Sequence, residues 1–251
     1  MPVLLRPDGT VQIGWDPHRA VLVRPPEGLS AGELAALLRS FPTTRAEAVR
    51  AGVDGLLDGL VASGVLRHRA GAQPRALSIR VHGRGPLSDL LSEGLRCSGA
   101  RLTDSGADLV VLADSLAAEP RLVRELQTTG VPHIPVRVRD GVGVVGPLVI
   151  PGLSSCLCCA DLHRTDRDAA WPALAAQLRE VIGCADRPAL LATAALALGQ
   201  LQQIIIGVRD GVPAAPPATL NATLEVDVAS QSIRARRWSR HPLCGCWNRQ
   251  G

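Results

Sequence analysis

Residues 154–159 read Ser-Ser-Cys-Leu-Cys-Cys, and residues 241–246 read His-Pro-Leu-Cys-Gly-Cys. The two segments hold five of the seven cysteines of this 251-residue chain. Cys156 and Cys159 have the spacing that wraps one side of a tetrahedral zinc ion. Cys244 and Cys246 would complete the ligand set, although their spacing is shorter than usual. One shared zinc ion therefore requires a fold that returns the tail of the chain to its middle.

The remaining cysteines leave alternatives open. Cys158 competes with either neighbour as a zinc ligand, whereas Cys97 and Cys184 lack a near partner and are expected to be buried, small apolar residues. Incidental core cysteines and disulfides are the competing interpretations of the whole set. The first residues, Met-Pro-Val-Leu-Leu-Arg-Pro, show no signal-peptide pattern. With an odd number of cysteines, this favours reduced thiols and a cytoplasmic protein.

Composition excludes some classes of protein. The chain is 46% hydrophobic and can form one large or two modest domains. It has no Lys, no Tyr and one Phe, which argues against a stacking platform for single-stranded nucleic acid. The apolar stretch 188–207 approaches membrane-spanning length, but Gly199, Gln200 and further glutamines interrupt it. We therefore expect a buried core helix and no membrane or nucleic-acid partner.

Residues 1–68 have the pattern of a small α+β domain. Strands are predicted at 3–5, 11–13 and 20–23, followed by a helix that Ser30 and Glu33 begin with a capping box. Further short helices are predicted over 43–49 and 53–61, and a closing strand at 65–66. This order is typical of a winged-helix-like domain. Residues 69–76 are polar, contain Gly and Pro, and are predicted to be a linker.

Residues 77–251 alternate strands with helices, which predicts a mainly parallel, Rossmann-like α/β sheet. The predicted helices include 119–128, 172–182 and 187–208, and a hairpin pairs 219–228 with 232–238. The charged segment after the first cysteine pair, 163–168, is either a solvated loop with weak ion pairs or a partner-docking loop. The six histidines show no pair at metal-ligand spacing.

A glycine turn follows the first strand of this second domain, where such folds bind nucleotide phosphates. It contains Gly83 and Gly85, but a third glycine is missing and Pro86 removes a backbone donor. Asp104 and Asp114 follow later strands at positions that could contact a ribose or a metal. Since the chain also lacks Lys, we expect a vestigial nucleotide turn and no ATP binding.

The order of these elements resembles the ThiF/MoeB superfamily of ubiquitin-activating-like adenylyltransferases. The segment 108–114, Asp-Leu-Val-Val-Leu-Ala-Asp, is similar to that family's third-strand motif. The resemblance places Cys156, Cys159, Cys244 and Cys246 at its structural zinc ligands. The altered glycine turn, the lack of Lys and the short Cys-x-Cys spacing depart from the family pattern.

The whole chain resembles more narrowly the ThiF-like partner protein of azoline-forming cyclodehydratases. The segments most similar to that group are Cys-Leu-Cys-Cys-Ala-Asp-Leu-His-Arg-Thr-Asp-Arg-Asp-Ala-Ala-Trp-Pro and His-Pro-Leu-Cys-Gly-Cys. The resemblance implies an N-terminal PqqD-like domain that binds the leader of a ribosomal precursor peptide. It also implies a ThiF-like part that does not adenylate, a separate YcaO-type cyclodehydratase that uses ATP, and a homodimer.

By the same resemblance, the peptide would add a strand to the third strand of the first domain, with the third helix as the opposite wall. The implied binding residues are Val21, Leu22, Val23, Arg24, Asp54, Leu57 and Leu60. Arg24 could then meet an acidic leader, although the apolar members could equally be ordinary core residues.

Three hypotheses about function follow. The first is a non-catalytic leader-peptide binding protein that recruits a precursor to a cyclodehydratase. The second is an adenylyltransferase that activates a carboxylate with ATP. The third, a winged-helix DNA-binding protein, is disfavoured because the predicted third helix is not rich in basic residues.

Overall fold

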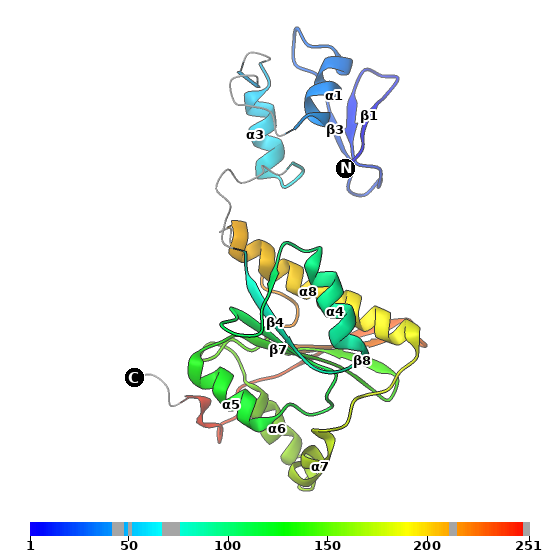
Figure 1. The fold of residues 1–251 in the computed structure, drawn as a ribbon. Coiled ribbons are helices and arrows are strands. Elements are labelled where there is room, and N and C mark those ends of the chain that lie inside the picture. Colours follow the sequence, from blue (N-terminus) through cyan, green and yellow to red (C-terminus); the bar gives the residue numbers. More distant parts are fainter. Residues whose placement is uncertain (42–47, 50–51, 67–75, 211–214, 248–251) are drawn as a thin grey trace. The chain divides into compact units, whose positions relative to one another are not determined.

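The computed structural model describes residues 1–41, 48–49, 52–66, 76–210 and 215–247. It divides into two compact units, Met1–Ala72 and Gln73–Gly251, which are described separately (Figure 1). The predicted linker 69–76 lies outside the described residues except for residue 76. The predicted helix 43–49 does so as well, except for its last two residues, which are helical.

The first unit contains a small antiparallel sheet of strands β1 (Val3–Leu5), β2 (Val11–Ile13) and β3 (Val21–Val23), in that order. Helix α1 (Ala31–Arg39) begins with the predicted capping box, in which the Ser30 backbone N–H donates to Glu33 Oε2 at 2.8 Å. Helix α3 (Asp54–Ala62) contributes its buried face to the same core as the sheet.

The predicted closing strand at residues 65–66 is wrong, because this segment forms bends rather than a strand. The backbone N–H of Leu66 donates to the carbonyl of Leu60 at 2.9 Å. That bond satisfies a carbonyl at the end of α3, where helices leave their last carbonyls without a helical partner. The apolar pair at 65–66 therefore ends a helix instead of extending the sheet.

The second unit is built on a seven-stranded sheet, in the order β10-β9-β8-β7-β6-β4-β5. Its pairings are parallel from β5 to β7 and antiparallel from β7 to β10, so the sheet is mixed rather than mainly parallel as predicted. The reason is that a tight turn at residues 140–141 joins β7 to β8 directly, where a parallel pair would need a long crossover. The strands are β4 (Ser78–His82), β5 (Arg101–Leu102), β6 (Leu109–Ala113), β7 (His133–Arg139), β8 (Val142–Val145), β9 (Ala222–Asp227) and β10 (Ser232–Arg237).

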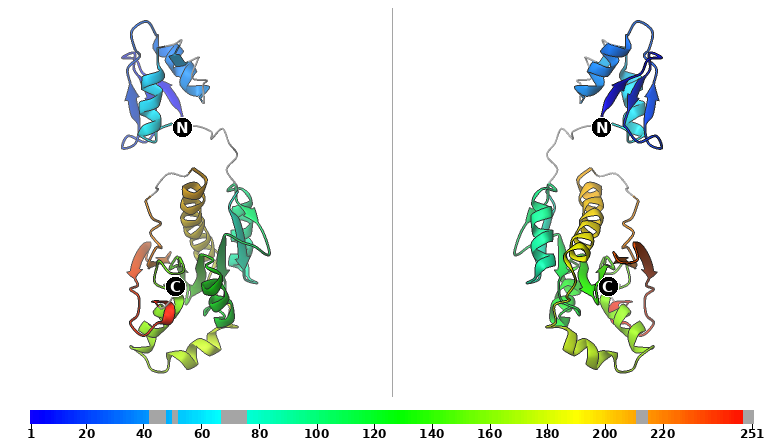
Figure 2. Two further views of the ribbon diagram at one scale, coloured as in Figure 1. Left: turned by 90° about the vertical axis from the view of Figure 1, so that its left-hand side faces the viewer. Right: turned by 90° about the vertical axis from the view of Figure 1, so that its right-hand side faces the viewer.

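Helices cover both faces of this sheet, as Figures 1 and 2 show. Helices α4 (Pro86–Arg96) and α8 (Arg187–Asp210) form one apolar core with strands β4, β6 and β7. On the opposite face, α5 (Pro120–Thr129) and α6 (Leu157–Thr165) pack against β6. Helix α7 (Trp171–Leu178) follows α6, and a short 3-10 helix, η1 (Gly245–Trp247), carries the last described residues. The sequence analysis missed α6.

Helix α8 is long and apolar enough to cross a membrane by length and composition, over Arg187–Val208. It is instead a core helix, as predicted. Ala194, Ala197, Leu201 and Ile205 are buried in the core that α8 shares with the sheet. The spacing of these four residues places them on one side of the helix.

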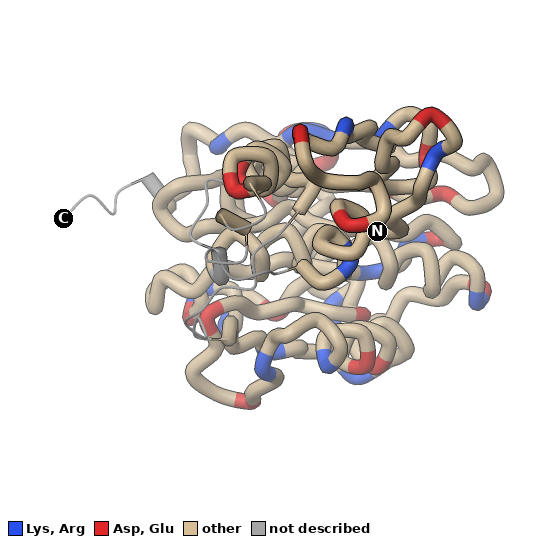
Figure 3. Tube along the Cα trace, turned by 90° about the horizontal axis from the view of Figure 1, so that it is seen from above, with Lys and Arg blue, Asp and Glu red and all other residues tan. Residues whose placement is uncertain are grey.

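Acidic and basic residues are both spread over the described parts of the chain, as Figure 3 shows. The formal net charge is only +4. The longest run of basic residues in the described second unit lies in and after the exposed strand β10, at Arg234, Arg236, Arg237 and Arg240.

Candidate metal centre and neighbouring sites

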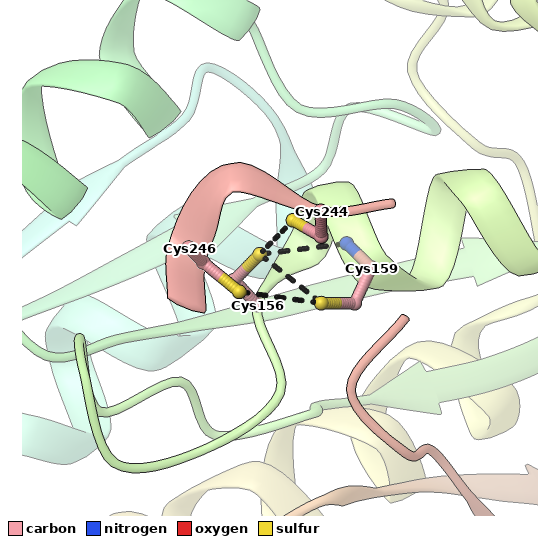
Figure 4. Close-up of side chains that lie close together, drawn as sticks. All are labelled: Cys156, Cys159, Cys244 and Cys246. Carbon is pink, nitrogen blue, oxygen red and sulfur yellow. Dashed lines mark hydrogen bonds between the residues drawn. The ribbon is translucent and has the colours of Figure 1, made fainter. Parts of the chain in front are cut away.

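The fold brings Cys156, Cys159, Cys244 and Cys246 together (Figure 4). The first pair lies at the start of α6 and the second pair in the tail around η1. The Sγ atom of Cys156 is 3.6 Å from that of Cys159 and 3.5 Å from that of Cys244. The Sγ atoms of Cys159 and Cys246 are 3.5 Å apart, and all four sulfurs lie within 4.8 Å of one another.

These distances fit four thiolates around one tetrahedral ion. A Zn–S bond of about 2.3 Å places tetrahedral sulfurs about 3.8 Å apart. A disulfide would instead bring two sulfurs to about 2.05 Å, and all seven cysteines are free. The cluster could therefore hold a zinc ion, and it does not consist of disulfides.

Without a metal ion, the surroundings of Cys159 and Cys246 disfavour the thiolate form of these residues. Hydrogen bonding to Cys156, followed by burial, raises the pKa of the Cys159 thiol to about 12. The pKa of Cys246 is also raised, first by burial and then by its hydrogen bond to Cys159. Four thiolates need a cation to offset their mutual repulsion, so metal binding here would release protons.

Local structure positions the first pair. Cys156 is the N-cap of α6, and its Sγ accepts a hydrogen bond from the backbone N–H of Cys159 at 3.4 Å. The preceding residue, Ser155, donates its backbone N–H to Asn221 Oδ1 at 2.7 Å. Asn221 immediately precedes β9, so the start of α6 is tied to the hairpin of β9 and β10.

A group of polar side chains ties the tail to α6 beside the cysteines. His241 Nε2 lies 2.9 Å from Asp166 Oδ2, and the backbone N–H of Leu243 donates to His241 Nδ1 at 3.1 Å. Because Nδ1 accepts a bond, Nε2 carries the proton and donates it to Asp166. His163 Nε2 lies 3.1 Å from the carbonyl oxygen of Ser239. Through these hydrogen bonds, both imidazoles hold the tail against α6.

The sequence analysis missed this group because its members, His163, Asp166 and His241, have no motif spacing. The position of His241 in His-Pro-Leu-Cys-Gly-Cys was the available signal. Its backbone also hydrogen-bonds to Cys159. The side chain and the backbone of His241 therefore contact α6 at two points.

The other cysteines lie apart from the four-sulfur cluster. Cys158 is exposed, and it is not among the four residues whose sulfurs gather. The prediction that Cys97 and Cys184 are buried is wrong, because both are exposed. Cys97 is the C-cap of α4, where the chain turns away from the core, and Cys184 lies in the loop before α8.

The glycine turn leads directly into α4, with Gly85 as the N-cap and Pro86 as the first helical residue. Asp114, at the end of β6, is only 2% exposed. Its Oδ1 accepts the backbone N–H of Leu87 at 2.9 Å, and its Oδ2 accepts that of Ser88 at 3.3 Å. The Asp114 carboxylate therefore lies where the first turn of α4 would present its N–H groups to a phosphate.

The Asp114 carboxylate leaves no room for a side chain at either glycine of the turn. A Cβ added to Gly83 would lie 2.6 Å from Asp114 Oδ2, and one added to Gly85 would lie 2.8 Å from Asp114 Cγ. The Ser88 hydroxyl accepts the backbone N–H of Gly85 at 3.0 Å. Asp104, the remaining predicted nucleotide residue, is exposed in the bend after β5.

The predicted peptide groove lies in the first unit. Strand β3 is an edge of the sheet, and its Leu22 is 55% exposed. Arg24 is also exposed, Val21 and Asp54 are partly exposed, and Val23 is buried. Leu57 and Leu60 of α3 are buried in the core of the unit together with Val23. The exposed surface at this edge therefore comes from β3 more than from α3.

The first unit also has a pocket of about 590 Å³ that the sequence analysis did not predict. It lies against β1 and the end of α1, and its lining includes Val3, Leu38, Phe41 and Leu66. The pocket therefore adjoins β1, whereas the predicted groove is at β3.

Comparison with known proteins establishes the class of fold. No family model and no curated protein matches the chain. Solved structures do match: the heterocyclase TruD aligns with 98% of this chain at a TM-score of 0.66 and 15% identity. A heterocyclase solved in complex with substrate and cofactor aligns with 98% of the chain at a TM-score of 0.65 and 15% identity. The chain covers 41% and 38% of those two proteins, respectively.

MccB of E. coli also shares part of the fold. It aligns with 71% of this chain and 67% of its own length, at a TM-score of 0.51 and 14% identity. The chain therefore has an α/β fold shared with TruD and MccB, and it spans less than half the length of the heterocyclases. The predicted resemblance is confirmed at the level of the fold.

Proposed function

We propose that this protein is a non-catalytic leader-peptide binding protein. It would recruit a ribosomal precursor peptide to a separate YcaO-type cyclodehydratase for azoline formation. In this proposal the first unit is a winged-helix-like peptide-recognition domain. The second unit is a degenerate ThiF-type domain that has kept the fold but no longer binds a nucleotide.

One observation carries the non-catalytic part of the proposal. The Asp114 carboxylate accepts the N–H groups of Leu87 and Ser88. Pro86 has no N–H to offer, and the N–H of Gly85 is bonded to the Ser88 hydroxyl. The donors that would bind a phosphate are thus satisfied inside the chain. A phosphate would also meet the negative charge of Asp114, and the chain has no lysine to offset that charge.

The edge of β3 supports the peptide-binding part. An edge strand presents unpaired backbone groups to which an extended peptide can add as a further strand. Leu22 is exposed on this strand, and Arg24 follows it. A peptide there would gain main-chain hydrogen bonds from β3 and an ion pair from Arg24 if its sequence is acidic.

Zinc would have a structural role. Four cysteine ligands leave no open position for a substrate, which is the arrangement of structural rather than catalytic zinc sites. Cys156 and Cys159 begin α6, while Cys244 and Cys246 belong to the tail. The ion would thus hold the tail against α6 and supply no step of a reaction.

The alternative function is an ATP-dependent adenylyltransferase. The observation in its favour is the likeness to E. coli MccB solved with AMPCPP and MccA, at a TM-score of 0.50 and 14% identity. Under this alternative, Asp114 would have to leave the N-terminus of α4 to admit ATP. The two functions therefore make opposite predictions about ATP.

Two measurements on the purified full chain test the proposal. The first is ATP–pyrophosphate exchange in the presence of candidate precursor peptides sought among the neighbouring genes, for which we expect no activity above background. The second is fluorescence polarisation with the same peptide, for which we expect saturable binding. Robust exchange would favour the adenylyltransferase, and a lack of binding would reject the recruiting role.

A matched pair of variants locates the groove. Leu22 on β3 and Leu5 on β1 are exposed strand leucines, 55% and 53% exposed, on opposite edges of the same sheet. Leu22→Asp should weaken peptide binding about tenfold or more, because it places a charge where the peptide would pack. Leu5→Asp should leave binding unchanged. The reverse result would move the binding site to the β1 edge and its neighbouring pocket.

A further inference from the structure

The second unit has a pocket of about 420 Å³ on the sheet face that carries α6 and α7. We call it the Arg137 pocket. Its floor contains Arg137, Val144 and Glu225, which are opposite one another on β7, β8 and β9. Trp171 and Trp238 contribute to its walls. Tryptophan rings beside charged groups suit a ligand that has both an apolar and a charged part.

Arg137 is partly buried at the floor of the pocket, and within the described residues no carboxylate is bonded directly to its guanidinium. Its Nη1 donates to the backbone carbonyl of Leu116 at 2.7 Å. Within the described part of the chain, no carboxylate oxygen lies within 4.0 Å of it. Desolvation is the main reason that the pKa of Arg137 is lowered to about 10, while the nearby charge of Asp161 acts in the opposite direction, so the group stays charged at neutral pH. Desolvating a charge that has no directly bonded counter-ion is costly, and such perturbed groups in a cleft are candidates for a functional site.

Three of the four acidic side chains in the lining are bonded to partners other than Arg137. Glu225 Oε1 pairs with Arg139 at 3.4 Å, and Asp161 Oδ1 accepts from Arg164 at 2.9 Å. Asp168 Oδ1 accepts the backbone N–H of Ala170 at 2.9 Å. In total, the pocket lining contains five arginines and four acidic residues. The lining therefore carries one more positive than negative charge, and Arg137 is the arginine at its floor.

The guanidinium of Arg164 stacks on both tryptophan rings of the pocket wall and helps to hold them in place. The Arg164 guanidinium lies 5.0 Å from the ring centroid of Trp171 and 5.0 Å from that of Trp238. The Nε1 of Trp238 donates to Thr223 Oγ1 at 2.8 Å. The walls are thus built before any ligand arrives, which lowers the ordering cost of binding.

We propose that the Arg137 pocket binds a carboxylate carried on an apolar group, such as the acidic side chain or terminal carboxylate of a peptide. The guanidinium would pair with the carboxylate, and the tryptophan and leucine walls would contact the apolar group. A carboxylate on an apolar group would use both the guanidinium and the tryptophan walls, whereas inorganic phosphate would use only the guanidinium. This inference concerns only the second unit and does not depend on the groove at β3.

Ligand titrations of the full chain, followed by tryptophan fluorescence, test the proposal. The probes are N-acetyl-L-leucine, its uncharged amide and inorganic phosphate. We expect saturable binding of the acid with a Kd on the order of 1 mM, and binding of the amide and phosphate at least about tenfold weaker. Arg137→Gln should abolish binding of the acid, whereas Arg96→Gln, at the exposed end of α4, should leave it unchanged. Equal binding of phosphate, or no saturable binding of the acid, would overturn the proposal.

A second pair of variants keeps the test decisive if Arg137→Gln fails to fold. Val144 lies directly opposite Arg137 across the antiparallel pair of β7 and β8, where side chains are close. Val144→Glu would supply a tethered carboxylate, and Val144→Gln is its uncharged match. If Arg137 lacks a counter-ion, the Glu variant should melt at a higher temperature than the Gln variant and should not bind the acid. A lower or equal melting temperature of the Glu variant would show that Arg137 is already compensated, and the proposal would fail.

Discussion

The two faces of the seven-stranded sheet are held by different forces. On the face that carries α4 and α8, buried aliphatic side chains form a continuous core, and glycines allow the closest approaches. A Cβ added to Gly143 of β8 would lie 2.0 Å from Thr193 Oγ1 of α8. On the opposite face, α6 and the tail are held by four cysteines and by hydrogen bonds such as that of His241 to Asp166.

The difference shows where this fold leaves room for ligands. A face sealed by close packing has no unpaired polar group to offer, because polar groups buried there would be costly. A face held by a few polar ties can keep a pocket with a charge in it, as at Arg137. The four predictions below test this contrast, from the largest expected effect to the smallest.

Loss of the metal should disrupt only the face that carries α6. Cys244→Ser, or extraction by a chelator, should lower the stability of the second unit by about 5 kcal/mol or more, since structural zinc binds with about 10–16 kcal/mol in small domains. In hydrogen exchange, α6 and the tail should lose protection before α4 and α8. The matched control is Cys97→Ser, which changes an exposed cysteine. Elemental analysis without bound zinc in reduced protein would contradict the prediction.

Small additions should disrupt only the face that carries α8. Gly143→Ala should cost about 1–3 kcal/mol, because the new methyl overpacks the contact between β8 and α8. Gly199 lies in α8 with nothing within 4 Å of an added Cβ. Gly199→Ala should therefore raise stability by about 1 kcal/mol through helix propensity. Urea denaturation measures both, and equal effects of the two substitutions would refute the packing contrast.

The N-terminal cap of α4 lies where strands β4 and β6 end. Asp114→Ala should lower the free energy of unfolding by about 1–2 kcal/mol, because two N–H groups lose their acceptor. Asp104→Ala, at an exposed carboxylate, should change it by less than about 0.5 kcal/mol. Thermal denaturation of the wild type and both variants, with and without ATP, measures these changes in stability. If ATP stabilises the wild type as strongly as the Asp114 variant, Asp114 does not exclude the nucleotide.

The face that carries α6 should be the acid-sensitive one. His133 of β7 is fully buried, and burial lowers its pKa, which means that the folded state disfavours its protonation. The unfolded state takes up the proton more readily, so stability should fall as the pH drops below the ordinary histidine value of about 6.5. His133→Phe should flatten this dependence between pH 7.5 and the folded-state pKa, whereas His18→Asn, at an exposed site, should not. A parallel decline in both variants would assign the sensitivity to other groups.

Sequence patterns predicted the features that depend on neighbouring residues. The capping box of α1 depends on residues three positions apart, and the hairpin of β9 and β10 depends on alternation along two adjacent segments. Helix α8 was predicted from its length and composition, and the glutamines that argued against a membrane span lie in it. These interactions act over short stretches of chain, where propensity and periodicity are informative.

Features that depend on distant residues were harder to predict. Helix α6 was missed because its sequence, which includes Cys158 and Arg164, is polar and has a weak apolar period. The mixed sheet was missed because strand alternation alone does not give strand direction. The burial of Cys97 and Cys184 was predicted from residue type, whereas their exposure follows from their positions at a helix end and in a loop.

The sequence alone determined that the two cysteine segments could share an ion and that the glycine turn was altered, since both are matters of residue type and spacing, whereas the structure decided that Cys158 is not one of the four clustered residues. Only the tertiary structure decided that Asp114 caps α4 and that, among the described residues, no carboxylate is bonded directly to Arg137. Asp114 is 27 positions from Leu87, and the two meet because β6 pairs beside β4. Whether a charge is satisfied depends on which groups folding buries together, and that is set by the packing of the whole unit rather than by any local stretch of chain.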